Sequence, residues 1–177
     1  MNHMKREYLN VDRLNQMEKE LGCTFCDDGE FAEMSMDLWN YAEKTQPIEG
    51  VRFDYYPGNP EELKTLVDSV DEDWSQYFDA ETPVFCAFLG DEVVSFCIVD
   101  PNAECILSRP DIKVGSIGCV GTAPAHRGRG IGLRMVDLAT VILQKEGCTK
   151  GYISYTHIDH WYAKLGYETF ARFSFRG

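Results

Sequence analysis

The stretch Thr122-Ala123-Pro124-Ala125-His126-Arg127-Gly128-Arg129-Gly130-Ile131-Gly132-Leu133 joins a glycine-rich strand pattern to the start of a long apolar-striped helix pattern. Its three glycines alternate with Arg127, Arg129 and Ile131. Glycine lets the backbone turn tightly, so that successive amide N–H groups point at one place at a helix N-terminus. The positive end of the helix dipole and two guanidinium groups add positive charge there. The stretch therefore predicts an anion site that suits a pyrophosphate.

Two common phosphate-binding motifs do not fit this stretch. A P-loop requires Lys-Ser or Lys-Thr after its glycines, and neither pair follows Gly132. A dinucleotide-binding turn requires the pattern G-x-G-x-x-G, and counting from Gly128 places Leu133 at the third glycine. The stretch is therefore either a phosphate loop of another kind or a simple connecting turn before a helix.

The segments after the loop alternate between strand and helix. The expected elements are a strand at Val114–Thr122, a helix at Ile131–Lys145, a strand at Gly151–Thr156, a short helix at His160–Leu165 and a last strand at Tyr167–Phe175. Gly147 and Gly166 end the two helices, as glycine commonly does just beyond a helix.

The segments before the loop extend the same pattern towards the N-terminus. They predict a strand at Val51–Tyr55, a helix at Glu61–Val70, a short helix opened by Asp71-Glu72-Asp73, and strands at Pro83–Leu89 and Glu92–Asp100. The last two are joined at Gly90-Asp91, a hairpin dipeptide. From Val51 the order is β-α-α-β-β-β-α-β-α-β, which predicts an α/β layer arrangement with hairpins on one side and crossover helices on the other.

Residues 1–50 are expected to form a helical N-terminal extension. Asn10 can cap a helix that runs to Leu21 and stops at Gly22. A second helix is expected at Phe31–Lys44, because Met34, Leu38, Tyr41 and Ala42 stand at helical spacing.

Two motifs in this order resemble those of the GNAT acetyltransferases. Arg127-x-x-Gly130-x-Gly132 is similar to the acyl-CoA pyrophosphate loop of that family, which also lies between a strand and a helix. His160-Trp161-Tyr162-Ala163-Lys164-Leu165-Gly166-Tyr167 resembles the family's late helix, whose tyrosine faces the CoA sulfur. The resemblance is close over residues 113–170 and extends by element order to Val51.

The resemblance implies the acyl-CoA N-acyltransferase fold, which is α/β with a mixed, mostly antiparallel central sheet and helices on both faces. It also implies a single domain over residues 1–177, with its core at 51–177. In this fold the strand Val114–Thr122 would splay near its end and offer backbone groups to the pantetheine arm. Residues 154–156 would line the other side, with Tyr155-Thr156 where many relatives have an asparagine.

The resemblance further implies acetyl-CoA as the acyl-donor cosubstrate. The cofactor-contacting residues would be Cys119, Val120, Gly121, Thr122, Arg127, Gly128, Arg129, Gly130, Ile131, Gly132, Thr156, Tyr162 and Lys164. The implied reaction is direct attack of a primary amine on the acetyl thioester, without a covalent enzyme intermediate. Tyr162 is the candidate general acid, since a phenol with a pKa of about 10 can protonate a departing thiolate.

The general base is not assigned by the sequence. Many relatives have a carboxylate on the strand before the loop, but Lys113–Thr122 contains none. The candidates elsewhere are Asp54, Asp71 to Asp73, Asp100, Glu104, His157 and His160, and for every one of these a structural or surface role is the simpler interpretation. Cys119 could chemically carry an acyl group, but a small, buried strand residue is the favoured interpretation.

The two halves of the chain differ in charge. Residues 1–110 carry 24 acids against 8 Lys/Arg, a balance of −16, and residues 111–177 carry 5 against 9, a balance of +4. The basic half suits a phosphorylated ligand. The acidic half suits a cationic amine on a small molecule or a protein, and the alternative that its acids only solvate the surface stays equally open. A pI of about 4.7 argues against nucleic-acid binding.

Localisation and assembly follow from simpler features. No apolar run reaches the ~18 residues of a membrane span, and no apolar stretch follows Met1–Arg6 as in a secretory signal. We therefore expect a cytoplasmic protein that does not interact with membranes. Because relatives in the family often pair through edge strands, a homodimer is left open.

Seven cysteines are scattered through apolar segments, which fits small buried residues in a reducing compartment. Cys23-Thr24-Phe25-Cys26 is the one close pair, and a structural zinc site would need a second. Two alternatives to an acetyltransferase therefore stay open. One is a non-catalytic acyl-CoA-binding sensor, supported by the missing strand carboxylate. The other is a zinc or redox protein built on Cys23 and Cys26.

Overall fold

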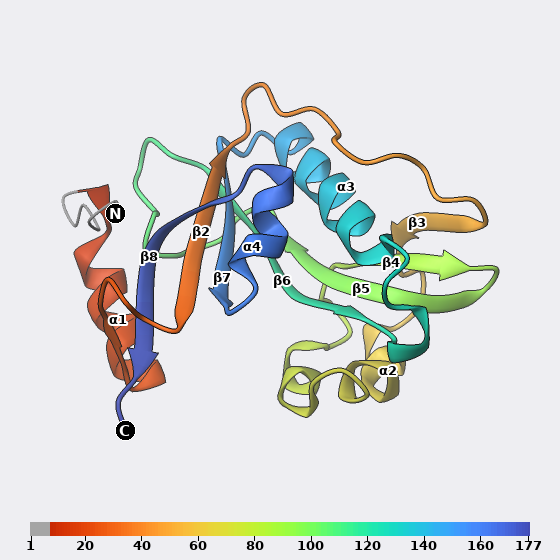
Figure 1. Cartoon of the computed structure of the whole chain (residues 1–177), viewed down its shortest axis with the longest axis horizontal. Helices are drawn as coiled ribbons and strands as arrows, with labels where there is room; N and C mark the ends of the chain where they lie inside the picture. Colours follow the sequence, from red (N-terminus) through yellow and green to blue (C-terminus); the bar gives the residue numbers. More distant parts are fainter. Residues whose placement is uncertain (1–7) are drawn as a thin grey trace. The chain divides into compact units, whose positions relative to one another are not determined.

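The computed structural model describes residues 8–177, which fall into two units (Figure 1). Met1–Arg6, considered above as a secretory signal and set aside, lie outside the described residues. The described part of the first unit comprises residues 8–41, 101–116 and 143–177. The second unit comprises residues 42–100 and 117–142. Each unit is described by itself.

The first unit is built on a sheet with the strand order β1-β8-β2-β7-β6. The strands are β1 (Cys23–Phe25), β2 (Phe31–Asp37), β7 (Lys150–Thr156), β8 (Glu168–Phe175) and the beginning of β6 (Val114–Thr122). The pairs β1–β8, β2–β8 and β2–β7 are antiparallel, and β6–β7 is parallel. In Figure 1, β2 lies between β7 and β8, as the pairing requires.

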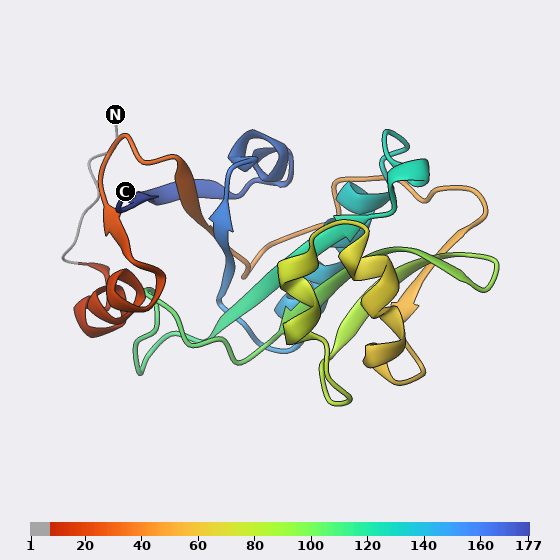
Figure 2. The ribbon, with the colours of Figure 1, turned by 90° about the horizontal axis from the view of Figure 1, so that it is seen from below.

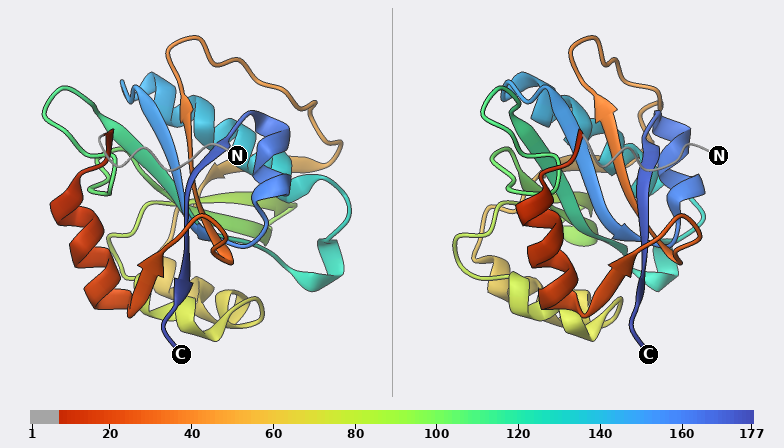
Figure 3. Two further views of the ribbon diagram at one scale, coloured as in Figure 1. Left: turned by 60° about the vertical axis from the view of Figure 1, so that its left-hand side comes forward. Right: turned by 90° about the vertical axis from the view of Figure 1, so that its left-hand side faces the viewer.

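Helix α1 (Val11–Leu21) packs against β1 in the first unit, as Figure 3 shows. The side chain of Asn10 accepts a hydrogen bond from the Arg13 amide, and Gly22 ends the helix at φ +64°. Both caps confirm the sequence prediction. The Asn10 side chain also donates to the Ser108 carbonyl at 2.9 Å, so the cap connects α1 to the loop before β6.

The second unit is built on strands β6, β5 (Glu92–Asp100), β4 (Val84–Leu89) and β3 (Val51–Tyr55), in that order. The pairs β3–β4 and β4–β5 are antiparallel. The 3-10 helices η2 (Pro60–Leu63) and η3 (Glu72–Tyr77) flank α2 (Lys64–Asp68), and a third, η4 (Pro124–His126), precedes α3 (Ile131–Lys145). The element order from Val51 is the predicted one.

Helices cover both faces of the sheet in the second unit. Helix α2 and its flanking segments cover one face of this sheet (Figure 2). Leu63, Val67 and Phe78 pack there with Phe88 and Phe96. On the other face Ile131 of α3 packs against Ala87 and Val94. The mixed, mostly antiparallel sheet with helices on both faces is thereby confirmed.

The helical N-terminal extension is wrong in its second half. Residues 23–25 and 31–37 are strands β1 and β2, and the predicted helix Phe31–Lys44 does not form. Strand β2 is central in its sheet, and Ala32, Glu33 and Met34 are all buried. Because both faces of the strand are covered, the alternation that identifies a half-buried strand is missing.

The apparent helical spacing in this segment has a different origin. Leu38 and Tyr41 are buried, but they lie in a connection rather than on a helix. The Gln144 side-chain amide donates to the carbonyls of both, at 2.7 and 2.9 Å. Tertiary hydrogen bonds to the backbone therefore hold this connection in place.

In residues 8–177, no helix is both long enough and apolar enough to cross a membrane.

Gly121 on β6 sits against the ring of Phe96, and a Cβ there would lie 2.5 Å from that ring. We expect Gly121→Ala to lower the free energy of unfolding by roughly 1–3 kcal/mol, because a methyl group would overpack the core. Gly118→Ala, on the same strand with no atom within 4 Å of its Cβ position, should change it little. Urea unfolding of both variants measures the difference. Equal destabilisation would contradict the close-contact explanation.

Candidate active site

The end of β6 is held by a buried hydroxyl from β5. Ser95 is fully buried, and its Oγ donates to the Gly121 carbonyl at 2.8 Å and lies 2.9 Å from the Thr122 Oγ1. The Ala123 amide donates to the Val94 carbonyl at 2.8 Å. These bonds fix the point at which the chain leaves the sheet and enters the glycine-rich loop.

The loop itself is exposed and has an open backbone. Residues 127–130 are exposed, and Gly128 and Gly130 both adopt φ +76°. No atom lies within 4 Å of the Cβ position of either glycine. Because L-residues rarely adopt this conformation, glycine is required by the backbone rather than by packing. The backbone of the loop is therefore accessible to a ligand.

The positive groups expected at this loop are present in the second unit. The Nε of Arg127 donates to the Thr122 carbonyl at 3.0 Å, which orients this side chain beside the end of β6. Arg129 lies 3.3 Å from the ring nitrogen of His126. Helix α3 begins at Ile131, and the first amides of an α-helix have no partner within the helix. These groups fit the pyrophosphate of an acyl-CoA, which Arg127, Arg129 and the amides at 128–132 would hold.

Cys119 is an unusual residue on β6. It adopts φ +48°, a left-handed conformation that costs a non-glycine residue about 1–2 kcal/mol. Burial, and to a lesser degree the Asp71 carboxylate, raise the pKa of its thiol to about 12. The thiol is therefore protonated at neutral pH and a poor nucleophile. This favours the interpretation of Cys119 as a small strand residue.

The segment that contains Asp71 lies near this part of β6, because Val70, Trp74 and Cys119 all pack against the same buried cluster. Asp71 caps η3, its side chain accepting from the Asp73 amide at 3.0 Å. Residues 42–100 of the second unit carry 14 acids against three Lys/Arg. The acidic residues 42–100 and the strained residue Cys119 therefore belong to the same unit.

The structure thus brings one group of predicted site residues together in the second unit. These are Cys119, Val120, Gly121, Thr122, Arg127, Gly128, Arg129, Gly130, Ile131 and Gly132. Thr156, Tyr162 and Lys164 belong to the first unit and form the second group.

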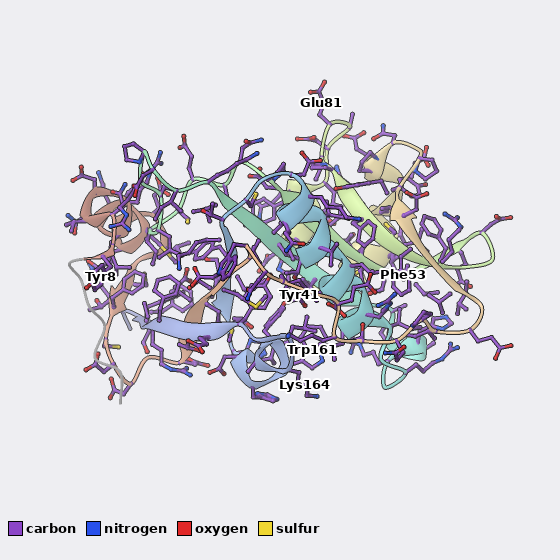
Figure 4. The ribbon with its side chains drawn as sticks, turned by 90° about the horizontal axis from the view of Figure 1, so that it is seen from above. Tyr8, Tyr41, Phe53, Glu81, Trp161 and Lys164 are labelled. Atoms are coloured by element: carbon purple, nitrogen blue, oxygen red, sulfur yellow. The ribbon has the colours of Figure 1, made fainter. Side chains whose placement is uncertain are left out.

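Tyr162 lies at the end of α4 (Asp159–Tyr162), which continues into the 3-10 helix η5 (Ala163–Leu165). It is 5% exposed, and its ring packs edge-on against Trp161, with centroids 4.9 Å apart. Lys164 is exposed, and Figure 4 labels both Trp161 and Lys164 on this helix. An Asp159–Arg172 ion pair connects α4 to β8 and so fixes the helix that carries Tyr162.

Thr156 ends β7, and its Oγ1 accepts from the Ile158 amide at 3.1 Å. The preceding residue, Tyr155, adopts φ +56°. Parallel pairing of β6 with β7 covers Val114–Ser116 and residues 150–152, although β7 runs on to Thr156. Tyr155 therefore lies beyond the part of β7 that pairs with β6, at a register shift in the pairing of β7 with β2.

Glu33 on β2 is a buried ionisable residue that the sequence analysis did not single out. It is fully buried, and its Oε1 accepts from the Ser154 hydroxyl at 3.0 Å and the Tyr155 amide at 2.8 Å. Its Oε2 bonds the Tyr152 hydroxyl. Burial raises its pKa from the ordinary 4.5 to about 8, despite the opposing hydrogen bonds from Tyr155 and Ser154. The wrong helix prediction at 31–44 concealed Glu33, because its carboxyl group is recognised as buried only when the segment is a strand covered on both faces.

The base candidates named from the sequence have simpler surroundings. His157 and His160 are exposed. Glu104 forms an ion pair with Arg13, and Asp54 one with Arg52 at 3.7 Å. None of these pairs isolates a carboxylate from water in the way that Glu33 is isolated.

Cys23 and Cys26 are both free thiols, Cys23 buried in β1 and Cys26 half-buried just after it. Burial raises the pKa of the Cys23 thiol. Within residues 8–177, no group of three or more His, Cys, Asp or Glu is placed to hold a metal ion.

The buried carboxyl of Glu33 should make stability depend on pH. The folded protein holds its proton between pH 4.5 and about 8, whereas an unfolded chain releases it. Its contribution is therefore complete below pH 4.5 and is lost as the pH rises through about 8. Between pH 4.5 and 8.5 the wild type should lose on the order of 4 kcal/mol relative to Glu33→Gln, as measured by urea unfolding. A constant difference between the two proteins would contradict the buried, protonated carboxyl.

Comparison with known proteins identifies the class to which this fold and loop belong. The profile of the acetyltransferase (GNAT) family matches residues 45–167. The chain therefore belongs to the GNAT acetyltransferase family, which uses acetyl-CoA as acyl donor. The sequence matches none of the curated proteins compared with it.

Several solved structures share the fold. A GCN5-related glucosamine N-acetyltransferase region of a fungal multi-domain GH3 beta-N-acetylglucosaminidase aligns with a TM-score of 0.66 and 21% identity, over 92% of this chain and 22% of that chain. A GCN5-related N-acetyltransferase from Kribbella flavida has a TM-score of 0.60 and 18% identity, over 90% and 61%. A GCN5-related N-acetyltransferase from Sphaerobacter thermophilus also has a TM-score of 0.60 and 18% identity, over 93% of this chain and 55% of that chain. This chain spans less than two thirds of each.

Proposed function

We propose that this protein is an acetyl-CoA-dependent N-acetyltransferase that acetylates a primary amine of a small cationic molecule or a protein. The observation that carries the proposal is the loop at Arg127–Gly132, with Gly128 and Gly130 in left-handed conformation at the start of α3. Membership of the GNAT family supports the acyl donor. When bound, acetyl-CoA supplies an activated acetyl thioester.

The protein's own residues have three tasks in this reaction. Arg127, Arg129 and the loop amides hold the pyrophosphate, and the backbone at Cys119–Thr122 orients the pantetheine arm. Tyr162 acts as general acid and gives its phenol proton to the departing sulfur. Tyr162 is 5% exposed, so most of this residue is shielded from water.

A cationic acceptor is supported by the acidic character of residues 42–100. Asp71 lies close enough to Cys119 to influence its pKa, so a negative charge faces this part of β6. A cationic amine would be drawn to such a surface. Glucosamine, named in the description of one solved relative, and spermidine are therefore suitable first amines to test.

A non-catalytic acyl-CoA sensor is the second candidate function. It is favoured by the absence of any carboxylate in the β6 sequence. A sensor would bind acetyl-CoA but acetylate none of the amines, whereas the enzyme would do both. A cytoplasmic location and a homodimer stay predictions.

Replacing Gly130 should remove cofactor binding. Gly130→Asp adds a negative charge and strains the backbone at φ +76°, so acetyl-CoA affinity should fall by at least about tenfold in calorimetry. Gly50→Asp is the matched control, because Gly50 has the same φ in the same unit and equally open surroundings. The control should bind normally. If both variants bind like the wild type, the pyrophosphate site is not at this loop.

Removing the Tyr162 hydroxyl should affect chemistry rather than binding. We expect Tyr162→Phe to lower kcat by roughly 10²-fold while the acetyl-CoA Kd stays unchanged, since a general acid acts on the leaving group. Tyr167→Phe is the control, because Tyr167 is also a buried phenol and lies 6.4 Å from Tyr162 between ring centroids. A free-thiol assay measures the rates. Equal rates for the two variants would remove Tyr162 from the mechanism.

A further inference from the structure

Glu33 is a buried carboxyl group that the proposed mechanism does not use. It lies on β2, between β7 and β8, and none of its surface is exposed. Its partner on β8 is Ala171, which offers no charge to compensate it. Burying an ionisable group without a counter-charge is costly, and a glutamine or an apolar residue would avoid that cost. Its surroundings therefore need an explanation beyond packing.

The hydrogen bonds of Glu33 lead from the interior to the end of β7. The Ser154 hydroxyl donates to Oε1 at 3.0 Å, and Ser154 is itself exposed. The Tyr155 amide donates to the same oxygen at 2.8 Å. Ser154 is thus the link through which a proton can move between the buried carboxyl and the surface.

The backbone at this point is held in an unfavourable conformation. Tyr155 adopts φ +56° while its amide remains bonded to Glu33. Left-handed conformation in a tyrosine costs about 1–2 kcal/mol, and such strain is found preferentially at functional sites. Backbone strain, a buried carboxyl group and an exposed hydroxyl therefore coincide at residues 154–155.

We propose that Glu33 and Ser154 form a proton relay for the acetyl transfer, in which Ser154 faces the acceptor amine and Glu33 acts through it as a positioning residue and final proton acceptor. The inference rests on the proposed function. It supplies a base in a protein whose β6 sequence offers none.

The proton balance of the relay is simple. As the amine nitrogen bonds the acetyl carbon, its N–H bond breaks and the proton passes to the Ser154 Oγ. The Ser154 hydroxyl proton passes at the same time to the Glu33 Oε1. The C–S bond breaks, and the sulfur takes the proton of Tyr162. Glu33 then returns its proton to water through Ser154, and Tyr162 regains one from solvent, so both groups are restored.

Several titratable groups lie close to the Glu33 carboxyl group. Tyr152 on β7 contacts Oε2 directly. The thiols of Cys23 on β1 and Cys105 in the loop before β6 interact with it electrostatically, and burial raises the pKa of both. Burial is the largest influence on Glu33, and it raises the pKa of this carboxyl group to about 8. The relay should therefore work best once the pH exceeds 8.

The test compares pH–rate profiles of wild type and Glu33→Gln from pH 6 to 9.5, using acetyl-CoA and whichever of glucosamine, spermidine or a lysine peptide is acetylated. The ratio of the two kcat values cancels the ionisation of the amine. We expect this ratio to rise with a midpoint near pH 8 to about 10²-fold, the usual size of a general-base contribution. A ratio independent of pH would mean a structural role and would overturn the relay.

Ser154 gives a second test that leaves the buried carboxyl in place. Ser154→Ala should lower kcat above pH 8 by at least about tenfold, whereas Ser154→Thr, which keeps a hydroxyl, should restore most of the rate. These variants also decide the question if Glu33→Gln does not fold. Equal rates for the alanine and threonine variants would overturn the relay.

Asp137→Asn is the matched control for loss of a buried carboxylate. Asp137 is fully buried in the second unit, where it accepts from the Lys44 and Thr45 amides at 2.9 and 2.7 Å. This variant should change stability but give a pH-independent rate ratio. Asp71→Asn should likewise keep the wild-type midpoint, and a shift there would assign the base to Asp71 instead.

Failure of the relay is distinguishable from failure of the proposed function. If the wild type binds acetyl-CoA in calorimetry but acetylates no amine, the transferase proposal fails and the relay with it. If the wild type acetylates an amine and Glu33→Gln keeps its pH profile, only the relay fails.

Discussion

The Ser95 hydroxyl is the contact on which the geometry of the phosphate loop depends. A buried hydroxyl without a partner would be costly, so its bonds to the end of β6 are strongly favoured. They hold Gly121 and Thr122 against β5, with the Phe96 ring in contact with Gly121. The loop therefore leaves the sheet from a rigid base, and the Arg127 guanidinium is oriented by the same strand end.

Backbone strain, which lowers the free energy of unfolding, occurs at one non-glycine residue on β6 and at one on β7. Cys119 on β6 and Tyr155 on β7 both adopt left-handed conformations, and Glu33 places a titratable group beside the second. Tertiary packing in each unit must offset these costs, because local sequence preference opposes them. The aromatic cluster of Phe31, Tyr155, Phe173 and Phe175 supplies part of that packing in the first unit.

Much of the fold could be predicted because its signals are local. The strand Val114–Thr122 and the helix Ile131–Lys145 have the predicted bounds, and the cap at Asn10 and the stop at Gly166 lie where the sequence places them. Turn and cap chemistry acts over a few residues, so it can be recognised without the rest of the chain. The loop residues 127–132 were identified in the same way, from glycine spacing and charge.

The sequence by itself determined the glycine-rich loop before a helix, the short helix that carries Tyr162, and through them the family. Only the tertiary structure decided that residues 23–25 and 31–37 form strands in the sheet of the first unit. It also decided the environment of Glu33. A strand that is buried on both faces has no alternating pattern, since its polarity is set by the neighbours it meets. The pKa of Glu33 likewise depends first on burial and then on hydrogen bonds from Tyr155 and Ser154, which lie more than a hundred residues away along the chain. Burial and partnership are properties of the folded chain, and no local pattern of side chains encodes them.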